Sequence, residues 1–286
     1  LFILINGFFI YRYNPYNYYF NSIKKIIPYP AMTIGNRIIT VSRLNNLVDI
    51  NRKIYENAYR VSFGKTKEGI NNLEVLRKNT KEELINNIIM EDILKEIDKS
   101  ISNKEVISEY KKLLSQMGSN KDIEMVLKYS SNIKESDIIK KIYIKMLKER
   151  VSENVLYNLK MKVLLIKPDN KEDQADWDIA LGKSQKISQL IREDKNAINE
   201  YLELYQDKSD YIVQNFGREY YFLEDLPEDF REVFKSLKPG SVSDPVKGDS
   251  GYYIFKVEES RGHYLGTLDD FLKSQREKLE IRYFIR

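Results

Sequence analysis

The residue types that most often carry out chemistry are scarce in this chain. Its 286 residues include no cysteine and a single histidine, His263, which lies in the loop-like stretch SRGHYLG. Without cysteine the chain has no thiol nucleophile, no disulfide and no thiolate metal ligand. A lone loop histidine also argues against a Ser-His-Asp relay and against a metal held by a pair of histidines. We therefore expect no metal site and no cofactor.

Two motif-like patterns are explained better by structure than by chemistry. The sequence FGKT, ending at Thr66, matches the end of a phosphate-binding P-loop, but Tyr59 stands where that loop requires its first glycine. The acidic pairs at 82–83 and 269–270 lie where helices are predicted to begin, and negative charge there complements the helix dipole. Neither pattern indicates catalysis.

The stretch KPGSVSDPVKGDSGYYIFKV, residues 238–257, is more informative because turns and apolar runs follow one another closely. Pro239-Gly240 predicts a type II turn, and the alternating GYYIFKV predicts a strand. Upstream, the apolar run from Val163 to Ile166 predicts a buried strand, and helical patterns follow over 176–206. A further strand and turn are predicted in REYYFLEDL, and a helix in PEDFREVFKSL. We expect a compact α+β unit over residues 159–262.

The same stretch resembles the parvulin family of peptidyl-prolyl isomerases, also known as the PpiC or rotamase type. The family pattern is L-x-x-G-x-x-S-x-P-V, then a turn, then G-Y-H-I-I-K-V. The positions that fall in register are Leu237, Gly240, Ser243, Pro245, Val246, Gly251, Tyr252, Ile254, Lys256 and Val257.

This resemblance implies an apolar pocket that holds a proline ring while the preceding amide rotates. The barrier to that rotation is ~18–20 kcal/mol, and the pocket lowers it by excluding water and by donating hydrogen bonds to the twisted amide. Carried over position by position, the resemblance predicts a peptide-binding pocket formed by Val163, Phe222, Leu226, Phe230 and Tyr253.

The polar half of the family's site is altered. The family usually has one histidine in its first strand and another in G-Y-H-I, but Val163 and Tyr253 stand at these positions. A tyrosine hydroxyl can donate a hydrogen bond, whereas valine cannot. The remaining candidates for a catalytic role are Asp207, Asp210, Ser250 and Tyr253. Whether the chain is an enzyme stays open, and we expect efficient isomerisation to be lost.

Residues 32–158 are predicted to form an almost wholly helical module. Gly-Asn at 35–36 predicts a turn between two short apolar stretches, and Ser42 predicts the N-cap of the first helix. Thr80 with Glu83 predicts a capping box that opens a second helix. Further helices are predicted from about Ser102, over 121–129 and over 136–150, and one more amphipathic helix over residues 263–286.

This order of parts resembles the PrsA and SurA type of extracytoplasmic foldases. In them a parvulin unit is inserted between a long helical part and a final helix that packs back onto it. The predicted fold class is therefore α+β: a mostly helical chaperone module like the N-terminal part of SurA, an inserted parvulin-like domain with a small antiparallel sheet, and a returning C-terminal helix.

The first 31 residues predict a membrane-anchor remnant followed by a linker. Residues 1–10 are nearly all apolar, too few for the ~20 that span a bilayer, and the tyrosine-rich residues 11–20 resemble an interfacial aromatic belt. With the family resemblance, this predicts a location on the extracytoplasmic face of a bacterial cell membrane, in the periplasm or cell envelope. The other interpretation is an apolar strand and loop of a soluble domain.

We therefore expect a membrane-anchored foldase or chaperone that binds unfolded or proline-containing polypeptide clients. No nucleic-acid partner is expected, because 47 basic and 43 acidic residues are interleaved along the chain rather than clustered. The first alternative is an active prolyl isomerase that uses Tyr253, Ser250 and either Asp207 or Asp210. The second is a non-catalytic envelope scaffold, in which a homodimer or larger oligomer would bury the helical module.

Overall fold

The computed structural model describes most of the chain as two compact units. The first unit comprises residues 1–151 and 269–286, and the second comprises residues 152–268. The predicted helix at 121–129, the apolar start of the chain, Asp207 and Asp210 lie outside the described residues. The described ranges are 28–59, 63, 67–116, 133–194, 196–205, 211–213 and 220–284.

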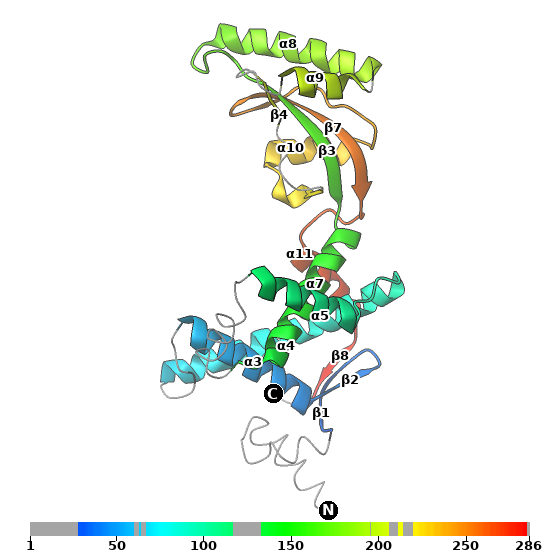
Figure 1. Ribbon diagram of the computed structural model, residues 1–286. Coiled ribbons are helices and arrows are strands. Elements are labelled where there is room, and N and C mark those ends of the chain that lie inside the picture. The colour runs from blue at the N-terminus through cyan, green and yellow to red at the C-terminus, as the bar shows by residue number, and fades with distance from the viewer. Residues whose placement is uncertain are drawn as a thin grey trace, which may run out of the picture. The chain divides into compact units, whose positions relative to one another are not determined.

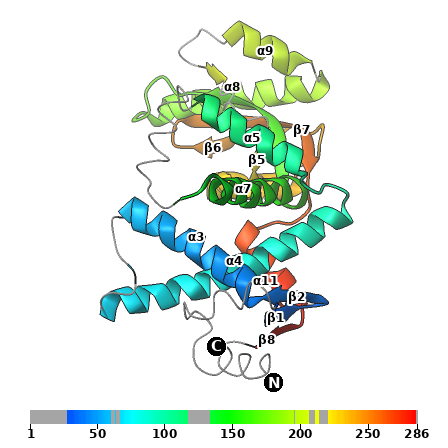
Figure 2. The same ribbon diagram turned by 60° about the horizontal axis from the view of Figure 1, so that its bottom comes forward.

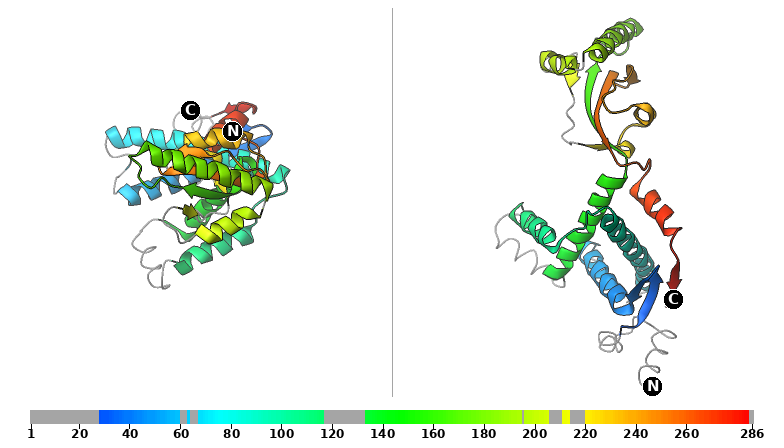
Figure 3. Two further views of the ribbon diagram at one scale, coloured as in Figure 1. Left: turned by 90° about the horizontal axis from the view of Figure 1, so that it is seen from above. Right: turned by 90° about the vertical axis from the view of Figure 1, so that its right-hand side faces the viewer.

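A three-stranded antiparallel sheet lies in the first unit, with the order β2-β1-β8 (Figure 3). Its strands are β1 (Pro30–Ile34), β2 (Arg37–Thr40) and β8 (Ile281–Tyr283). The predicted turn joins β1 to β2, and Gly35 supplies the positive φ of 52° that the turn requires.

The C-terminal segment departs from its prediction as a single helix. The helix α11 (Leu268–Arg276) ends before β8 begins. The free edge of β1 explains the difference, since its backbone groups need partners. Gly35 donates its N–H to the Glu280 carbonyl at 3.0 Å, and Phe284 donates its N–H to the Ala31 carbonyl at 2.9 Å. Pairing along this edge overrides the amphipathic pattern of the last residues.

Four helices form most of the first unit, and Figure 2 shows α3 crossing α4. They are α3 (Val41–Tyr59), α4 (Lys67–Glu96), α5 (Asn103–Gln116) and α7 (Glu135–Val155). Aliphatic residues spaced along one side of each helix provide the core, as the helical periodicity predicts. Among its fully buried side chains are Met32, Ile39, Leu44, Ile85, Ile88, Met90, Leu94 and Leu147.

The predicted helix start at Thr80 is wrong, because α4 begins at Lys67 and runs through this residue. Thr80 is buried, donates its hydroxyl to the Leu76 carbonyl at 2.7 Å and accepts a hydrogen bond from Asn51 of α3 at 3.0 Å. The threonine thus joins two helices instead of capping one. The N-cap of α3 also shifts, since it is the hydroxyl of Thr40 that accepts the Arg43 N–H.

The second unit is built on a five-stranded antiparallel sheet with the order β4-β3-β7-β6, in which the short β5 also pairs with β3. The two long strands pair along their whole length, and Val163 lies opposite Phe255. The strands are β3 (Asn158–Ile166), β4 (Tyr211–Val213), β5 (Tyr221–Phe222), β6 (Val246–Gly248) and β7 (Gly251–Arg261).

Strand alternation divides this sheet into two faces. Leu164 and Ile254 belong to a cluster with Trp177 and Ile187 under α8 (Gln174–Glu193) and α9 (Ala197–Tyr205). The residues of opposite parity, such as Val163 and Phe255, pack towards α10 (Glu228–Ser236). Figure 1 shows α8 and α9 on one side of the sheet and α10 on the other.

The predicted α+β class is confirmed, with a mostly helical part and an inserted unit that contains a small antiparallel sheet. Within the residues described by the structure, every helix is too short or too polar to cross a membrane.

Candidate functional site

The turn that follows α10 is held by the glycine of the sequence motif. Gly240 has a φ of 83°, which a side chain would strain, and Ser241 donates its N–H to the Lys238 carbonyl at 3.0 Å. This is the expected type II turn. Gly240 also donates its N–H to the Val257 carbonyl at 2.8 Å, so the turn is attached to β7.

Ser243 of the motif connects the next segment to the middle of β7. It is buried, its N–H donates to the Phe255 carbonyl at 2.8 Å, and its hydroxyl accepts the Phe255 N–H at 3.0 Å. Ser188 of α8 donates its hydroxyl to the Ser243 carbonyl at 2.8 Å. The motif serine is therefore a structural residue whose hydrogen bonds fix the backbone around Phe255.

Gly251 allows β7 to approach β3 closely at the start of their pairing. Its φ is 147°, and a Cβ atom at this position would lie 2.2 Å from the Ile166 carbonyl oxygen. No side chain fits there. Gly251 thus sets the approach of β7 to β3, whereas Gly240 and Ser243 attach the segment after α10 to β7.

The result is a cluster of four rings, which we call the aromatic face: Phe230, Phe234, Tyr253 and Phe255. The Phe230 ring centroid lies 4.9 Å from that of Tyr253 and 5.0 Å from that of Phe255, and the Phe234 and Phe255 centroids are 4.8 Å apart. These spacings are typical of favourable aromatic pairs. Phe234 and Phe255 are buried, whereas Phe230 and Tyr253 are only half-buried and offer ring surface to a ligand.

Gly248 of β6 lies directly against the two half-buried rings. A Cβ atom on it would come within 2.8 Å of Tyr253 Cε2 and 3.3 Å of Phe230 Cζ. The sequence reasoning did not single out this glycine. The contact of Gly248 with Tyr253 depends on the pairing of β6 with β7, which the sequence does not show. The alternation of GYYIFKV, in contrast, predicts that Tyr253 and Phe255 lie on the same face of their strand.

The structure brings together four of the predicted pocket residues. Val163, Leu226, Phe230 and Tyr253 belong to one hydrophobic cluster, in which Val163 and Leu226 are buried. Phe222 is half-buried and is not among the residues of this cluster, which instead includes the neighbouring Tyr221. Adjacent strand residues point to opposite faces, so only one of this pair can face α10.

The candidates for polar chemistry are distributed differently. Val163 is aliphatic, and its side chain is 2% exposed. Ser250 lies in the turn between β6 and β7, where its hydroxyl accepts a hydrogen bond from Lys171 Nζ at 3.5 Å. Of the four catalytic candidates, only Tyr253 therefore lies within the aromatic face among the described residues. This face can hold an apolar ring and exclude water, and its phenol can donate a hydrogen bond.

Comparison with known protein families identifies this part of the chain. Residues 148–271 match the family of PPIC-type PPIASE domains, so the second unit is a parvulin-type domain, and the resemblance read from the sequence motif is confirmed. The comparison with curated proteins gave no match.

Several solved structures are similar to parts of the chain. The peptidyl-prolyl isomerase PrsA from Bacillus anthracis is 21% identical, with a TM-score of 0.24, over 68% of this chain and 86% of its own. A chain from the structures of PEB4 and Cj1289, described as SurA-like chaperones of Campylobacter jejuni, is 12% identical, with a TM-score of 0.29, over 89% of this chain and 98% of its own. The assignment of residues 148–271 rests on the family match alone.

Proposed function

We propose that this protein is a foldase-like chaperone whose parvulin-type domain binds unfolded or proline-containing polypeptide through the aromatic face, with little or no isomerase activity. The observation that carries the proposal has two parts. Half-buried Phe230 and Tyr253 form a ring pair, while a buried Val163 stands at a position where the family usually has a histidine. The surface that can hold a proline ring remains, whereas one of the two polar groups has become a buried aliphatic side chain.

A proline ring gains from such a surface because it is apolar and already rigid. Contact with the faces of Phe230 and Tyr253 removes water from both partners, at ~25 cal/mol per Å² of apolar area. The proline side chain loses little conformational freedom on binding. No cofactor takes part in this mechanism, and the helical module of residues 32–158 would hold other segments of the same client.

The competing function is an active prolyl isomerase. The match to PPIC-type domains and the phenol of Tyr253, whose ring packs against Phe230, favour it. In this mechanism the rings exclude water from the amide and Tyr253 donates a hydrogen bond to the twisted geometry, as a preorganised donor can. Acceleration of cis–trans exchange would distinguish this function from binding alone.

The proposal is tested by measuring the affinity of a proline-containing peptide for the full chain with Leu226→Ala and Phe230→Ala combined. We expect a loss of affinity of about tenfold or more, because both the ring contact and its support are removed. Lys235→Ala is the matched control, since Lys235 is an exposed residue of the same helix.

A second variant keeps the test valid if the double mutant does not fold. Gly248→Ala keeps every ring but forces a methyl group against Tyr253 and Phe230, so it should also weaken binding. Unchanged affinity in both folded variants would contradict the assignment of the aromatic face.

We further propose an extracytoplasmic location, with the N-terminal segment acting as a membrane anchor. The apolar residues 1–10, the tyrosines that follow and the family of the second unit support this. The test is fractionation of cells that express the chain with and without residues 1–31. Membrane association that persists after this deletion would contradict the anchor.

A further inference from the structure

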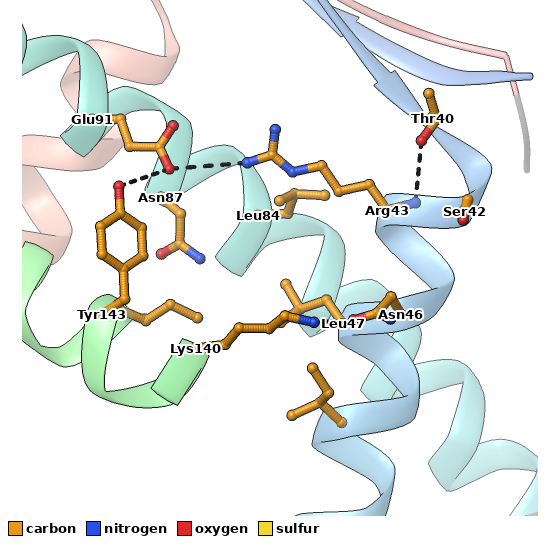
Figure 4. Close-up of a pocket in the computed structure, with 12 residues that line it drawn as sticks. Thr40, Ser42, Arg43, Asn46, Leu47, Leu84, Asn87, Glu91, Lys140 and Tyr143 are labelled. Carbon is orange, nitrogen blue, oxygen red and sulfur yellow. Dashed lines mark hydrogen bonds and ion pairs between the residues drawn. The ribbon is translucent and has the colours of Figure 1, made fainter. Parts of the chain in front are cut away.

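A pocket in the first unit lies far along the sequence from the aromatic face. It opens between α3, α4 and α7, and its volume of about 480 Å³ is within the range of ligand sites (Figure 4). Its apolar wall comes from three helices and consists of Leu47, Ile50, Leu84 and Ile144. Polar side chains complete the lining, and their pairing indicates what kind of ligand it would accept.

The carboxylate of the pocket is already compensated. Glu91 accepts a hydrogen bond from the Tyr143 hydroxyl at 3.2 Å, and its oxygens lie 3.1 Å from Arg37 NH1 and 3.9 Å from Arg43 NH2. Burial, and then the nearby Glu91 carboxylate, raises the pKa of Tyr143 to about 12, so its phenol remains a neutral donor. The negative charge of Glu91 is therefore shared by two arginines and is not available to a cationic ligand.

Lys140 gives the pocket an excess of positive charge. Its Nζ atom donates a hydrogen bond to the neutral Asn46 amide oxygen at 2.8 Å. Among the described residues, no carboxylate lies within ion-pair distance of it. Figure 4 shows the Lys140 side chain reaching from α7 towards α3 across the pocket. A ligand carboxylate would complete this pairing.

Asn87 supplies the second observation that points to a ligand. The residue is 5% exposed, lines the pocket, and its buried Oδ1 atom has no hydrogen-bond partner among the described residues. A buried polar atom without a partner is costly, and a native structure usually satisfies it. In Figure 4 the amide lies between Tyr143 and the side chains of α3.

A primary amide has the same donor and acceptor groups as a peptide unit. It can accept from a backbone N–H and donate to a backbone carbonyl at the same time, and rotation about its last side-chain bond is soft enough to present either atom. A fatty acid has no N–H to offer, and an inorganic anion has no group for the apolar wall. Asn87 therefore favours a peptide over both.

We propose that this pocket, the helical pocket, binds the C-terminal end of a polypeptide whose last side chain is apolar. Lys140 pairs with the terminal carboxylate, Asn87 with the last peptide unit, and the apolar wall formed by Leu47, Leu84 and their neighbours holds the side chain. The inference deepens the proposed chaperone function, since it names the part of a client that the helical module would hold.

The test uses the full chain and a fluorescently labelled, proline-free peptide that ends in Ala-Leu. Without proline the peptide does not depend on the aromatic face. Fluorescence anisotropy should show binding of the free acid, and amidation of the same peptide should weaken it about tenfold or more. A third peptide, with an internal glutamate and an amidated end, separates recognition of a chain end from recognition of any carboxylate.

Two variants link this preference to the pocket. Lys140→Gln should remove the difference between free acid and amide, and Asn87→Leu, close in size, should weaken both peptides. Lys145→Gln is the control, because this lysine lies on the same helix, is exposed and pairs with Glu149. Thermal unfolding of each variant confirms that it is folded before binding is measured.

Each contrary outcome has a distinct meaning. Equal affinity for acid and amide, equal affinity for the internal-glutamate peptide, or competition by laurate at matched concentration would overturn the inference. If proline peptides still bind in a Phe230-dependent manner, the proposed function survives that failure. If only the chain-end peptide binds, the helical pocket stands and the aromatic face fails.

Discussion

The aromatic face and the helical pocket, the two proposed polypeptide-binding sites, differ in composition and charge. The aromatic face consists of four rings that pack on aliphatic side chains, with the Tyr253 hydroxyl as its polar group, and it suits an apolar ring in either chain direction. The helical pocket combines an apolar wall with Lys140, which has no ion-pair partner among the described residues, and with the Asn87 amide oxygen, which has no hydrogen-bond partner among them. Charge gives the second site a direction that the first lacks, so the two should select different parts of a client.

The two proposed sites also differ in how far the sequence alone indicates them. Gly240, Ser243 and Gly251 stand close together in the chain because each fixes backbone geometry beside one strand, β7. Such local requirements produce a readable motif. The residues of the helical pocket come from three helices and the end of β2, which lie far apart in the sequence, so only the tertiary structure assembles them.

The change with the largest expected effect is Gly251→Ala, which disrupts the pairing of β7 with β3 on which the aromatic face depends. Its methyl group would lie 2.2 Å from the Ile166 carbonyl oxygen in a strained backbone conformation. We expect the parvulin-type domain not to fold. Circular dichroism and proteolysis should show that protection is lost over residues 152–268, and a fully protected variant would contradict the close approach.

Phe234→Ala should destabilise the same unit without abolishing the fold. The ring is fully buried against Phe255 of β7, and removing such a ring typically costs 3–5 kcal/mol. Urea unfolding, with hydrogen exchange to separate the units, measures the change in the free energy of unfolding. A loss below about 1 kcal/mol would mean that Phe234 is not part of the core.

Two variants, one in each site, test whether the aromatic face and the helical pocket bind independently. Phe230→Ala should weaken proline peptides about tenfold and leave the free-acid, proline-free peptide unaffected, whereas Lys140→Gln should do the reverse. The reason is that the two side chains belong to sites with no residue in common. Anisotropy titrations with both peptides test this, and a variant that weakens both equally would show that the sites are not independent.

The smallest expected effect is a pH dependence confined to the helical unit. The hydrogen bond from Arg150, with further bonds from Ser102, lowers the pKa of Glu105 from its usual 4.5 to about 2. A lowered pKa in the folded state gives stability that is present above pH 4.5 and is lost as the pH falls towards 2. The pair is partly exposed, so the contribution is at most about 1 kcal/mol.

Comparison of the native chain with Glu105→Gln measures this contribution. The difference in unfolding free energy should shrink between pH 5 and pH 3, as followed by denaturant titration. A difference that stays constant over this range would show that the carboxylate is not stabilised by its partners.

The departures from the sequence predictions share a physical cause. Thr80 carried the pattern of a capping box, but Asn51 of a distant helix supplies its partner and the helix continues through it. The last residues had a helical pattern in the sequence, but Ile281–Tyr283 form the strand β8 because they pair with the edge of β1. In both cases a long-range contact outweighs a local preference, which a single sequence does not reveal.

The strand and turn pattern of residues 237–257 was predicted correctly because its requirements are local. Phe222 stays a predicted pocket residue; its neighbour Tyr221 is the one that packs against the cluster, since adjacent strand residues point to opposite faces. Gly248 was missed because its neighbours are defined only across two strands.

We propose that this parvulin-type domain binds proline-containing peptides without efficient isomerisation. The most direct measurement is cis–trans exchange in a short Ala-Pro peptide, followed by NMR with and without the full chain. Uncatalysed exchange takes tens of seconds, so even modest catalysis is measurable. We expect peptide resonances that shift on titration, an exchange rate that stays at the uncatalysed value, and loss of the shifts with Phe230→Ala. Accelerated exchange that Phe230→Ala abolishes would contradict it and establish an active isomerase.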